Sequence, residues 1–312
     1  VVDRQVPEEA LSDAQVLFLQ ATTRPRLPEQ EAASIDARLQ GFTLSISALS
    51  SYLRCPLGFF YEYVMGAPVQ ESESAAYGSA VHNALQRYFE QMLQDEKQRF
   101  PDCEVLIGLF EREMRGLRGR VSPAFFEQRL ESGRRYLAAY YNRHRASWPR
   151  RVRVEQHLRN AEIDGVPISG TIDRLDLPER GPAHIVDYKT GAPKADRPRR
   201  PTPARPEGGA YWRQLVFYKL LYEHADPGAP SVGAGTISFI EPDADGKPVE
   251  ETLTYRPEDL EAVRGMIRDT YAAIRRHDFQ GCGEARCAWC NFVRHNVLVD
   301  SFSDPEVEEL DD

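Results

Sequence analysis

The chain has 312 residues, 41% of them hydrophobic and 10% aromatic, and a formal net charge of -9 at pH 7. This composition is typical of a globular protein and excludes an intrinsically disordered one. Because no apolar run approaches the length of a transmembrane helix and no secretory signal is present, we expect a cytoplasmic protein with no membrane partner.

The two ends of the chain are predicted to lie outside its folded part. Residues 1–41 contain many Pro, Glu and Arg residues, as expected of a connector or of the remnant of a preceding domain. The first residue is Val rather than Met, which suggests a processed product or part of a longer polypeptide. Residues 301–312 include the acidic run DPEVEELDD and are predicted to form a disordered tail. One domain is therefore expected over residues 42–300.

Helices are predicted over most of the first half of the chain. Ser47 is a candidate helix N-cap, and Pro56 is placed to open the following helix. From Ala75 onward apolar residues recur every three or four positions, and His82 lies at the edge of that apolar stripe. A lone histidine at such an edge is more often a structural residue than a ligand, and both alternatives stay open at this point. Further helices are predicted over 104–118, 122–148, 211–223 and 257–277.

Strands are predicted mainly in the second half of the chain. The pair Asp164-Gly165 is a hairpin-turn signal, and Thr171–Leu177 and His184–Thr190 are expected to form neighbouring antiparallel strands. Two later strands are predicted over 236–241 and 250–255. Helices and strands combined in this way indicate a protein of the α/β class.

The predicted pair of strands gathers two acids and a lysine. Successive side chains of a strand alternate between its faces, so Asp187 and Lys189 project to one side. Asp173 lies at the same point of the preceding strand. Converging carboxylates repel one another unless a cation lies between them, and Mg²⁺ and Mn²⁺ prefer oxygen ligands. The pattern indicates a metal site suited to phosphodiester hydrolysis, with charged residues on a solvated face of the hairpin as the alternative.

Arginines are concentrated in two regions near these strands. Arg150 and Arg151 belong to a cluster at the end of the helix predicted over 122–148. Arg197, Arg199 and Arg200 lie in a Pro-rich and Arg-rich stretch that follows the strand carrying Asp187 and Lys189. This stretch is predicted to be an irregular cationic loop that leaves directly from the metal site.

The cysteines form a second group of potential ligands. Cys282, Cys287 and Cys290 have the spacing C-x4-C-x2-C, and Cys55 lies far upstream of them. A tetrahedral zinc site or a cubane iron–sulfur cluster commonly takes four protein ligands. Cys55 would supply the fourth ligand, or His295 would do so in a zinc site. Free thiols without a metal are the remaining alternative.

Five short motifs, taken together, carry a resemblance to a known family. Their order is LSISALSSYLRCPLGFFYEYV, AAYGSAVHNAL, GTIDRLD, IVDYKTG and QLVFY. They resemble, in the same order, the opening segment, the histidine motif, the two metal-binding motifs and the Q-x-x-x-Y motif of RecB-like nucleases in the PD-(D/E)XK superfamily. The resemblance spans Leu44 to Phe292. Within the family, the chain most resembles the C-terminal nuclease modules of UvrD-like and AddB-type helicase–nucleases.

The resemblance implies a restriction-endonuclease-like αβββαβ core, with a mixed sheet flanked by helices and added N-terminal helices. It implies four ligands for Mg²⁺ or Mn²⁺, namely His82, Asp173, Asp187 and the main-chain carbonyl of Tyr188. It also implies that Lys189 is the catalytic lysine and that Gln214 and Tyr218 shape the active site. Iron–sulfur members of the family carry a late C-x2-C-x5-C where this chain has C-x4-C-x2-C, so a [4Fe-4S] cluster and zinc both stay open.

These observations predict a Mg²⁺- or Mn²⁺-dependent deoxyribonuclease that acts on single-stranded or unwound DNA in end processing, recombination or repair. An exonuclease is expected rather than an endonuclease, together with a helicase domain on the same or a partner polypeptide. The two arginine regions would contact phosphates without reading the base sequence. The alternatives are a free-standing exonuclease and a catalytically silent nuclease-like fold that serves as a DNA-binding or helicase-scaffolding module.

Overall fold

The described part of the chain divides into two compact units. The computed structural model describes residues 32–69, 71–193 and 198–295. Within it, the first unit combines residues 32–40, 51–68 and 273–295, and the second combines residues 41–50 with the region between 69 and 272. The limits of a single nuclease domain over residues 42–300 stay a prediction.

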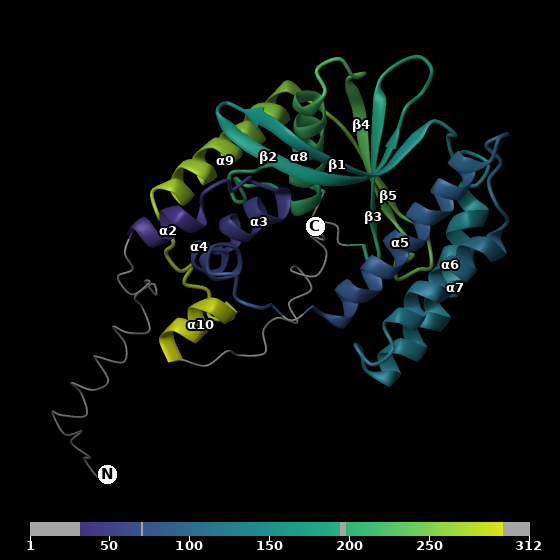
Figure 1. Ribbon diagram of the computed structural model, residues 1–312, viewed down its shortest axis with the longest axis horizontal. Coiled ribbons are helices and arrows are strands. Elements are labelled where there is room, and N and C mark those ends of the chain that lie inside the picture. The colour runs from purple at the N-terminus through teal and green to yellow at the C-terminus, as the bar shows by residue number, and fades with distance from the viewer. Residues whose placement is uncertain (1–31, 70, 194–197, 296–312) are drawn as a thin grey trace, which may run out of the picture. The chain divides into compact units, whose positions relative to one another are not determined.

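A mixed sheet forms the centre of the second unit (Figure 1). Its strands follow one another across the sheet in chain order: β1 (Val152–Ile163), β2 (Val166–Asp176), β3 (Ala183–Lys189), β4 (Val232–Phe239) and β5 (Glu250–Thr254). β3 and β4 are parallel, and the other neighbouring pairs are antiparallel. The predicted antiparallel pairing of the strands that carry Asp173 and Asp187 is therefore confirmed.

The β1–β2 hairpin follows from its two turn residues. Asp164 and Gly165 have φ angles of 51° and 81°, and a two-residue type I′ turn requires positive φ at both central positions. Ile163 and Val166 pair directly across this turn. The predicted turn is confirmed, and it sets the register of β1 and β2 as far as Ala161, beyond which the register shifts by one residue before Leu158.

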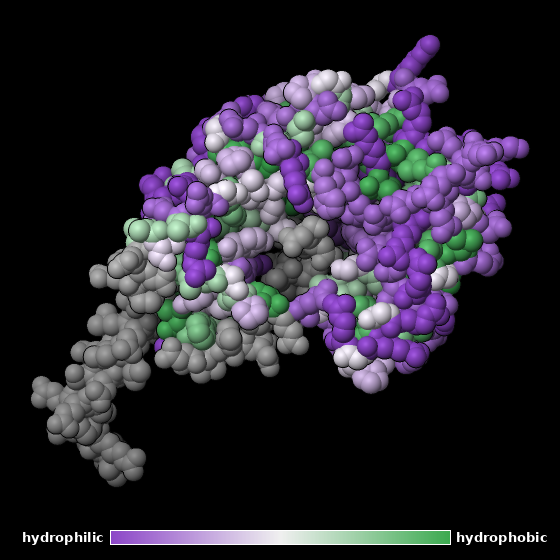
Figure 2. Space-filling model, in the orientation of Figure 1, coloured by the Kyte–Doolittle hydropathy of each residue, from purple (hydrophilic) through white to green (hydrophobic). Residues whose placement is uncertain are grey.

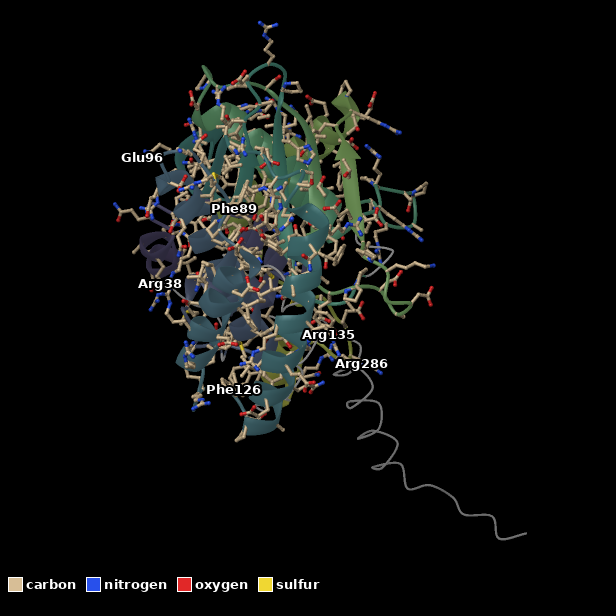
Figure 3. The ribbon with its side chains drawn as sticks, turned by 90° about the vertical axis from the view of Figure 1, so that its right-hand side faces the viewer. Arg38, Phe89, Glu96, Phe126, Arg135 and Arg286 are labelled. Atoms are coloured by element: carbon tan, nitrogen blue, oxygen red, sulfur yellow. The ribbon has the colours of Figure 1, made fainter. Side chains whose placement is uncertain are left out.

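Three helices form a layer on one face of the sheet: α5 (Glu73–Gln94), α6 (Cys103–Gly116) and α7 (Pro123–His144). Their apolar sides share a buried cluster with Val186 and Tyr188 of β3. Phe89 and Phe126 lie within this layer, whereas the side chains of Glu96 and Arg135 reach the surface (Figure 3). On the face that Figure 2 shows, hydrophilic side chains cover most of the surface over these helices.

α8 (Ala210–Ala225) packs on the opposite face of the sheet (Figure 1). Every residue from Tyr211 to Tyr222 is buried, so this helix has no solvent-exposed side over those turns. Its close approach to the sheet leaves little room at Gly235, where a Cβ would meet the Tyr255 hydroxyl and lie 3.0 Å from Leu215 Cδ2. α9 (Pro257–Arg275) packs against α8 in turn, because Trp212 Nε1 donates to Asp259 at 3.0 Å.

These elements confirm the predicted fold class. α5, β1, β2, β3, α8 and β4 give the αβββαβ order, with α6 and α7 inserted after α5 and with β5 and α9 added after β4. The protein is therefore an α/β protein with a mixed sheet flanked by helices. No helix of the described ranges is both long and apolar enough to cross a membrane.

The first unit consists of short helical segments packed through aromatic side chains. They are α2 (Ala32–Arg38), α4 (Pro56–Phe59), the π-helical turn η1 (Phe60–Val64) and α10 (Ala288–His295). Tyr61 stacks on Trp289 with ring centroids 4.8 Å apart. Trp289 Nε1 also donates to the Glu62 carboxylate at 2.8 Å. These contacts hold α10 against η1.

Two local predictions were wrong in detail. Ser47 is the predicted N-cap, whereas α3 (Ile46–Arg54) begins before it and Ser45 Oγ accepts from the amide of Ala48 at 3.1 Å. Serines flank Ile46 on both sides, and the local pattern does not distinguish between them. Within the predicted connector, residues 32–38 form α2, whose Ile35 is buried.

Candidate active site

The predicted acids meet at the point where two strands separate. The β2–β3 ladder ends at the pair Arg174 and Val186, and in the same register the next pair would be Asp173 and Asp187. Instead, the amide of Tyr188 donates to Asp173 Oδ2 at 2.7 Å. The side chain of Asp173 therefore accepts from a β3 amide that no strand partner takes. The end of the ladder brings the two acids together.

Lys189 lies beside Asp187, as the alternation of side chains along β3 predicts. Its Nζ is 3.0 Å from Asp187 Oδ2, and the two side chains are 5% and 2% exposed. The ammonium also lies 5.4 Å from the centre of the Tyr211 ring, within the range of a cation–π contact. Tyr211, which the sequence analysis did not single out, thus helps to hold the lysine in place.

The surroundings give Asp173 and Asp187 different pKa values. Burial raises the pKa of Asp187 to about 7; the Lys189 ammonium opposes this shift and the charge of Asp173 reinforces it. Asp173 is buried too, but the charges of His82 and Lys189 and the Tyr188 amide lower its pKa below the usual carboxyl value. Unless further positive charge is present, Asp187 therefore keeps its proton up to about pH 7.

His82 reaches the acids from α5. Its Nε2 lies 3.2 Å from the carbonyl oxygen of Tyr188, which accepts from Nε2–H in the tautomer that this geometry favours. Its Nδ1 lies 3.5 Å from Asp173 Oδ1, so the protonated ring pairs with Asp173, whereas the neutral ring would offer the Nδ1 lone pair to a metal. A histidine that donates one ring N–H to a backbone carbonyl is oriented to bind a metal through its other nitrogen. The environment of His82 therefore suits a ligand.

Glu155 of β1 also lies in this group, and the sequence analysis missed it. Potential ligand atoms of His82, Glu155 and Asp173 all lie within 4.8 Å of one another. In the register of the hairpin Glu155 stands opposite Asp173. Its φ is 45°, a conformation that residues other than glycine rarely adopt. The sequence could not have identified it, because its local pattern is that of an ordinary charged strand and the register set by the hairpin turn shifts by one residue between Leu158 and Ala161.

Gln214 and Tyr218 are one turn apart on α8, as predicted. Gln214 Nε2 donates to the Tyr218 hydroxyl at 3.1 Å, while Gln214 Oε1 is buried with no hydrogen-bond partner in the described part of the chain. Burial raises the pKa of Tyr218 well above its usual value, and the charges of Asp187 and Asp173 add to the shift. Tyr218 therefore lies close to both acids and stays protonated.

Arg174 supports the site from the other face of the sheet. It follows Asp173 on β2, so the two side chains project to opposite faces. Arg174 is buried, forms an ion pair with Asp176 at 2.8 Å and donates to the Tyr188 hydroxyl at 2.7 Å. It thereby fixes Tyr188, whose amide and carbonyl contact Asp173 and His82.

Comparison with known proteins assigns the chain to a family. Residues 43–294 match the family model described as the PD-(D/E)XK nuclease superfamily. The chain belongs to this superfamily. A curated relative from Carboxydothermus hydrogenoformans, which is named as part of an ATP-dependent helicase/deoxyribonuclease, is 23% identical over 186 residues, or 48% of this chain. The chain spans only 16% of the length of that relative.

A solved structure shows the same fold. The crystal structure of a putative exonuclease from Eubacterium rectale matches with a TM-score of 0.50 and 15% identity, covering 88% of this chain and 94% of that chain. At this identity the likeness shows the fold alone. Together with the superfamily match, it confirms the RecB-like resemblance seen in the sequence.

The donors gathered in this nuclease fit a divalent cation. Nucleases of this superfamily use divalent metals, and the donors here are carboxylates, an imidazole and a backbone carbonyl. Oxygen donors of this kind suit Mg²⁺ or Mn²⁺. Burial and the charge of Asp173 raise the pKa of Asp187, and a bound cation would lower it by stabilising the carboxylate.

A cleft of the nuclease adjoins the acids. Tyr218 forms part of its wall, and its volume is about 290 Å³. The other lining side chains are largely hydroxyl-bearing or basic: Ser45, Ser47, Ser169, Thr171, His157 and Arg159. Gly170 and Thr171, which precede Asp173 on β2, also line the cleft, so the cleft lies along the strand that carries Asp173.

The predicted DNA-contacting arginines have different surroundings. Arg150 and Arg151 line a second cleft, of about 430 Å³. Arg199 is exposed and lines a third cleft, of about 340 Å³. Arg197 lies outside the described residues. Arg150, Arg151 and Arg199 therefore have the access that contact with a nucleic acid requires.

Arg200 is placed differently from the other arginines of its loop. Its Nε donates to Asp259 at 2.9 Å, and its Nη2 donates to the carbonyl of Thr254 at 2.8 Å. These contacts tie the loop to α9. Arg200 therefore has a structural role, which the sequence could not indicate because Asp259 is distant along the chain, and its predicted contact with DNA stays a prediction.

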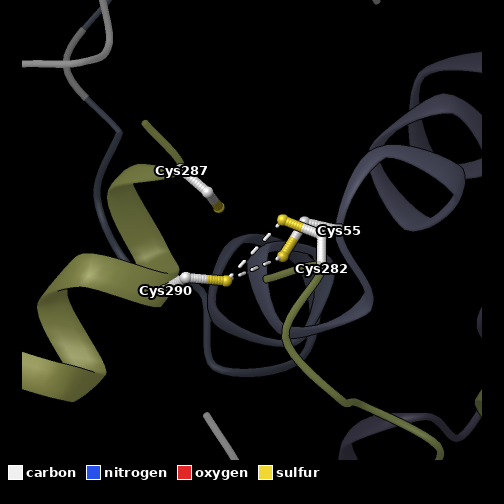
Figure 4. Close-up of side chains that lie close together, drawn as sticks. All are labelled: Cys55, Cys282, Cys287 and Cys290. Carbon is white, nitrogen blue, oxygen red and sulfur yellow. Dashed lines mark hydrogen bonds between the residues drawn. The ribbon is translucent and has the colours of Figure 1, made fainter. Parts of the chain in front are cut away.

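The four predicted cysteines converge in the first unit (Figure 4). Cys290 Sγ lies 3.8 Å from Cys55 Sγ and 3.7 Å from Cys282 Sγ, and all four sulfurs, with that of Cys287, lie within 4.8 Å of one another. Cys55 also caps α4, since its Sγ accepts from the amide of Gly58 at 3.4 Å. The side chain of His295, the alternative fourth ligand, lies outside the described residues.

Asp187→Asn is expected to raise the thermal midpoint of the metal-free protein, and more at pH 8 than at pH 5. Since the pKa of Asp187 is about 7 in the folded chain and 3.8 without its surroundings, its contribution to stability is full below about pH 4 and is lost as the pH rises to about 7. A neutral amide removes this loss. Thermal unfolding followed by circular dichroism in a chelator gives the measurement.

Asp269→Asn is the matched control, because the Asp269 side chain is 75% exposed. It should leave the pH profile unchanged. An Asp187→Asn profile that runs parallel to that of the wild type would show that Asp187 titrates normally.

Proposed function

We propose that this nuclease hydrolyses phosphodiester bonds of single-stranded or unwound DNA with Mg²⁺ or Mn²⁺. The observation that carries the proposal is the meeting of Asp173, Asp187 and Lys189 where β2 and β3 separate. Two acids with different pKa values and an adjacent amine are the groups that metal-dependent hydrolysis of a phosphodiester needs. We further propose an exonuclease rather than an endonuclease.

The residues of the site have different proposed roles in the reaction. We propose that the cation is held by His82, Asp173, Asp187 and the carbonyl of Tyr188. When bound there, it would polarise a phosphoryl oxygen and lower the pKa of its water. Lys189, fixed between Asp187 and Tyr211, would orient the attacking water and stabilise developing negative charge. The protonated hydroxyl of Tyr218 would donate to a phosphate oxygen.

The cleft beside Tyr218 supports a path for the DNA strand. Its hydroxyl groups and Arg159 offer hydrogen-bond donors for phosphate without a base-reading surface. We propose that a phosphate next to the scissile one binds there and that Arg150, Arg151 and Arg199 contact more distant phosphates. Binding of this kind depends strongly on salt and little on sequence.

We also propose that the chain is the nuclease part of a helicase–nuclease. The curated relative is named as part of a helicase/deoxyribonuclease, and the chain spans 16% of its length. The helicase would lie on the same or a partner polypeptide, and the complex would act in the cytoplasm in DNA end processing, recombination or repair.

The four cysteines are proposed to hold a metal centre. Four thiolates around one zinc ion at about 2.3 Å stand about 3.8 Å apart in a tetrahedron. The sulfur distances of 3.7 and 3.8 Å match this spacing. In a cubane each thiolate binds a different iron, so the sulfurs stand farther apart. The geometry thus favours zinc, whereas the family resemblance favours a [4Fe-4S] cluster.

Asp187→Ala and Lys189→Ala are each expected to reduce cleavage of labelled single-stranded DNA with Mg²⁺ or Mn²⁺ by about 100-fold or more, because each removes a group that acts on the transition state. Product formation on denaturing gels gives the rate, and a circular single strand separates endonuclease from exonuclease activity. Lys247→Ala, whose side chain is 73% exposed, is the matched control. Equal rates in all variants would favour the catalytically silent alternative.

Arg159→Gln is expected to weaken DNA binding and to reduce the slope of log affinity against log salt by about one phosphate contact. Fluorescence anisotropy with a labelled single strand, titrated at several salt concentrations, measures both quantities. Arg112→Gln on α6 is the control, since its side chain is 55% exposed. If the slope is the same for Arg159→Gln and Arg112→Gln, the cleft does not bind phosphate.

Elemental analysis of protein purified without oxygen decides the cysteine centre. One zinc per chain and no colour are expected from the sulfur spacing, whereas iron with sulfide and a brown colour would identify a cluster. Cys290→Ser should lose the metal and lower the thermal midpoint, because a metal that binds only the folded chain stabilises it. Cys103→Ser, at the start of α6, is the control.

A further inference from the structure

We propose that the second cleft, which Arg150 and Arg151 line, takes an unpaired base of the DNA strand together with a phosphate, and that it makes the nuclease selective for single strands. The inference rests on the proposed nuclease and deepens it, because it names the feature of the strand that is recognised away from the active site. The cleft has a volume of about 430 Å³, within the range of pockets that hold small ligands. It has an aromatic side and a cationic side.

The aromatic side of the second cleft consists of Phe100 and Trp148. Their ring centroids lie 5.5 Å apart, and Phe100 also stacks on Tyr88 with an interplanar angle of 18°. The ring of Phe89 contacts both Phe100 and Trp148, with centroids 5.6 and 5.2 Å away. These contacts hold the half-buried ring of Phe100 in one orientation against the core. A rigid, partly exposed ring is the kind of group on which an unstacked base binds.

The cationic side of the second cleft consists of three exposed arginines: Arg145, Arg150 and Arg151. The guanidinium of Arg145 lies 5.6 Å from the centre of the Tyr141 ring, which keeps this side chain along the aromatic cluster. Glu179 is the one acidic residue among the described residues that line the cleft. The excess of positive charge suits a phosphate. The cleft therefore offers a ring for a base and guanidinium groups for the backbone, which are the two contacts that bind a single strand.

A row of basic side chains along β1 joins the second cleft to the cleft beside Tyr218. Its members are all exposed: Arg151, Arg153, His157 and Arg159. Val152 and Val154, which alternate with them, pack into the core on the face of α5, α6 and α7, so the row projects to the face of α8. Burial raises the pKa of Tyr222 on α8 and the charge of Arg153 opposes this shift, which agrees with that placement. The first member of the row lines the second cleft, and the last two line the cleft beside Tyr218.

The row passes the active site on its way between the two clefts. Glu155 interrupts it and stands opposite Asp173 in the β1–β2 ladder. Leu177, which lines the second cleft, follows Asp173 by four residues, so the cleft lies about 13 Å from the active site along the strand. A DNA strand bound along the row therefore passes the acids before one of its bases reaches Phe100. A base inside a duplex is paired and stacked, so only an unpaired base enters the cleft.

Fluorescence anisotropy with labelled single-stranded and duplex DNA, in a chelator that prevents cleavage, tests the inference. Phe100→Leu should weaken single-strand binding by about fivefold or more, because it removes a stacking ring, and should leave duplex binding unchanged. Since stacking is not ionic, the slope of log affinity against log salt should also stay unchanged. Phe125→Leu is the matched control, because Phe125 is half-buried against the same core but does not line the second cleft. It should bind both DNAs as the wild type does.

Phe100→Tyr provides a second variant that keeps the ring, and it should bind single strands as tightly as the wild type. The inference is overturned if Phe100→Leu binds single strands as the wild type does, if it loses single-strand and duplex binding equally, or if Phe100→Tyr is as weak as Phe100→Leu. Single-strand binding that depends on the ring of Phe100, in a protein that cleaves no DNA with Mg²⁺ or Mn²⁺, would instead overturn the proposed function and leave the base-binding cleft in place.

Discussion

The arrangement of the active site depends on burying carboxylates at the end of the β2–β3 ladder. The ladder stops at Arg174 and Val186, which leaves a β3 amide for the side chain of Asp173 and sets Asp187 beside it. Burial raises the pKa of Asp187 to about 7. In a low-dielectric site the two carboxylates repel each other strongly. The side chains on both faces of the sheet are therefore needed to keep Asp173 and Asp187 together.

Each face contributes a different kind of support. On the face of α5, α6 and α7, Arg174 binds the hydroxyl of Tyr188 and so fixes the peptide that contacts both Asp173 and His82. On the face of α8, the ring of Tyr211 lies against Lys189. The consecutive residues Asp173 and Arg174 therefore have different roles. Asp173 is part of the site, and Arg174 makes the site rigid from the other face of the sheet.

The sequence predicted what depends on local pattern. The alternation along β3 predicted the contact of Asp187 with Lys189, and the Asp164-Gly165 turn predicted the hairpin. It could not predict the positive φ of Glu155, because a glutamate within a charged strand carries no local sign of a left-handed conformation. It also could not predict that the guanidinium of Arg200 binds Asp259, because the two residues are distant along the chain. No periodicity records a long-range partner of this kind.

A catalytically silent role fits the energetics of this site poorly. The raised pKa of Asp187, the left-handed backbone of Glu155 and the Oε1 of Gln214, which is unsatisfied within the described part of the chain, each reduce the stability of the metal-free fold. A scaffold would be more stable with an amide at the first position and a glycine at the second. Because a ligand that binds only the folded state stabilises it by mass action, divalent ions would offset these costs. The carboxylates that weaken the metal-free fold are thus the groups through which a bound cation would stabilise the domain.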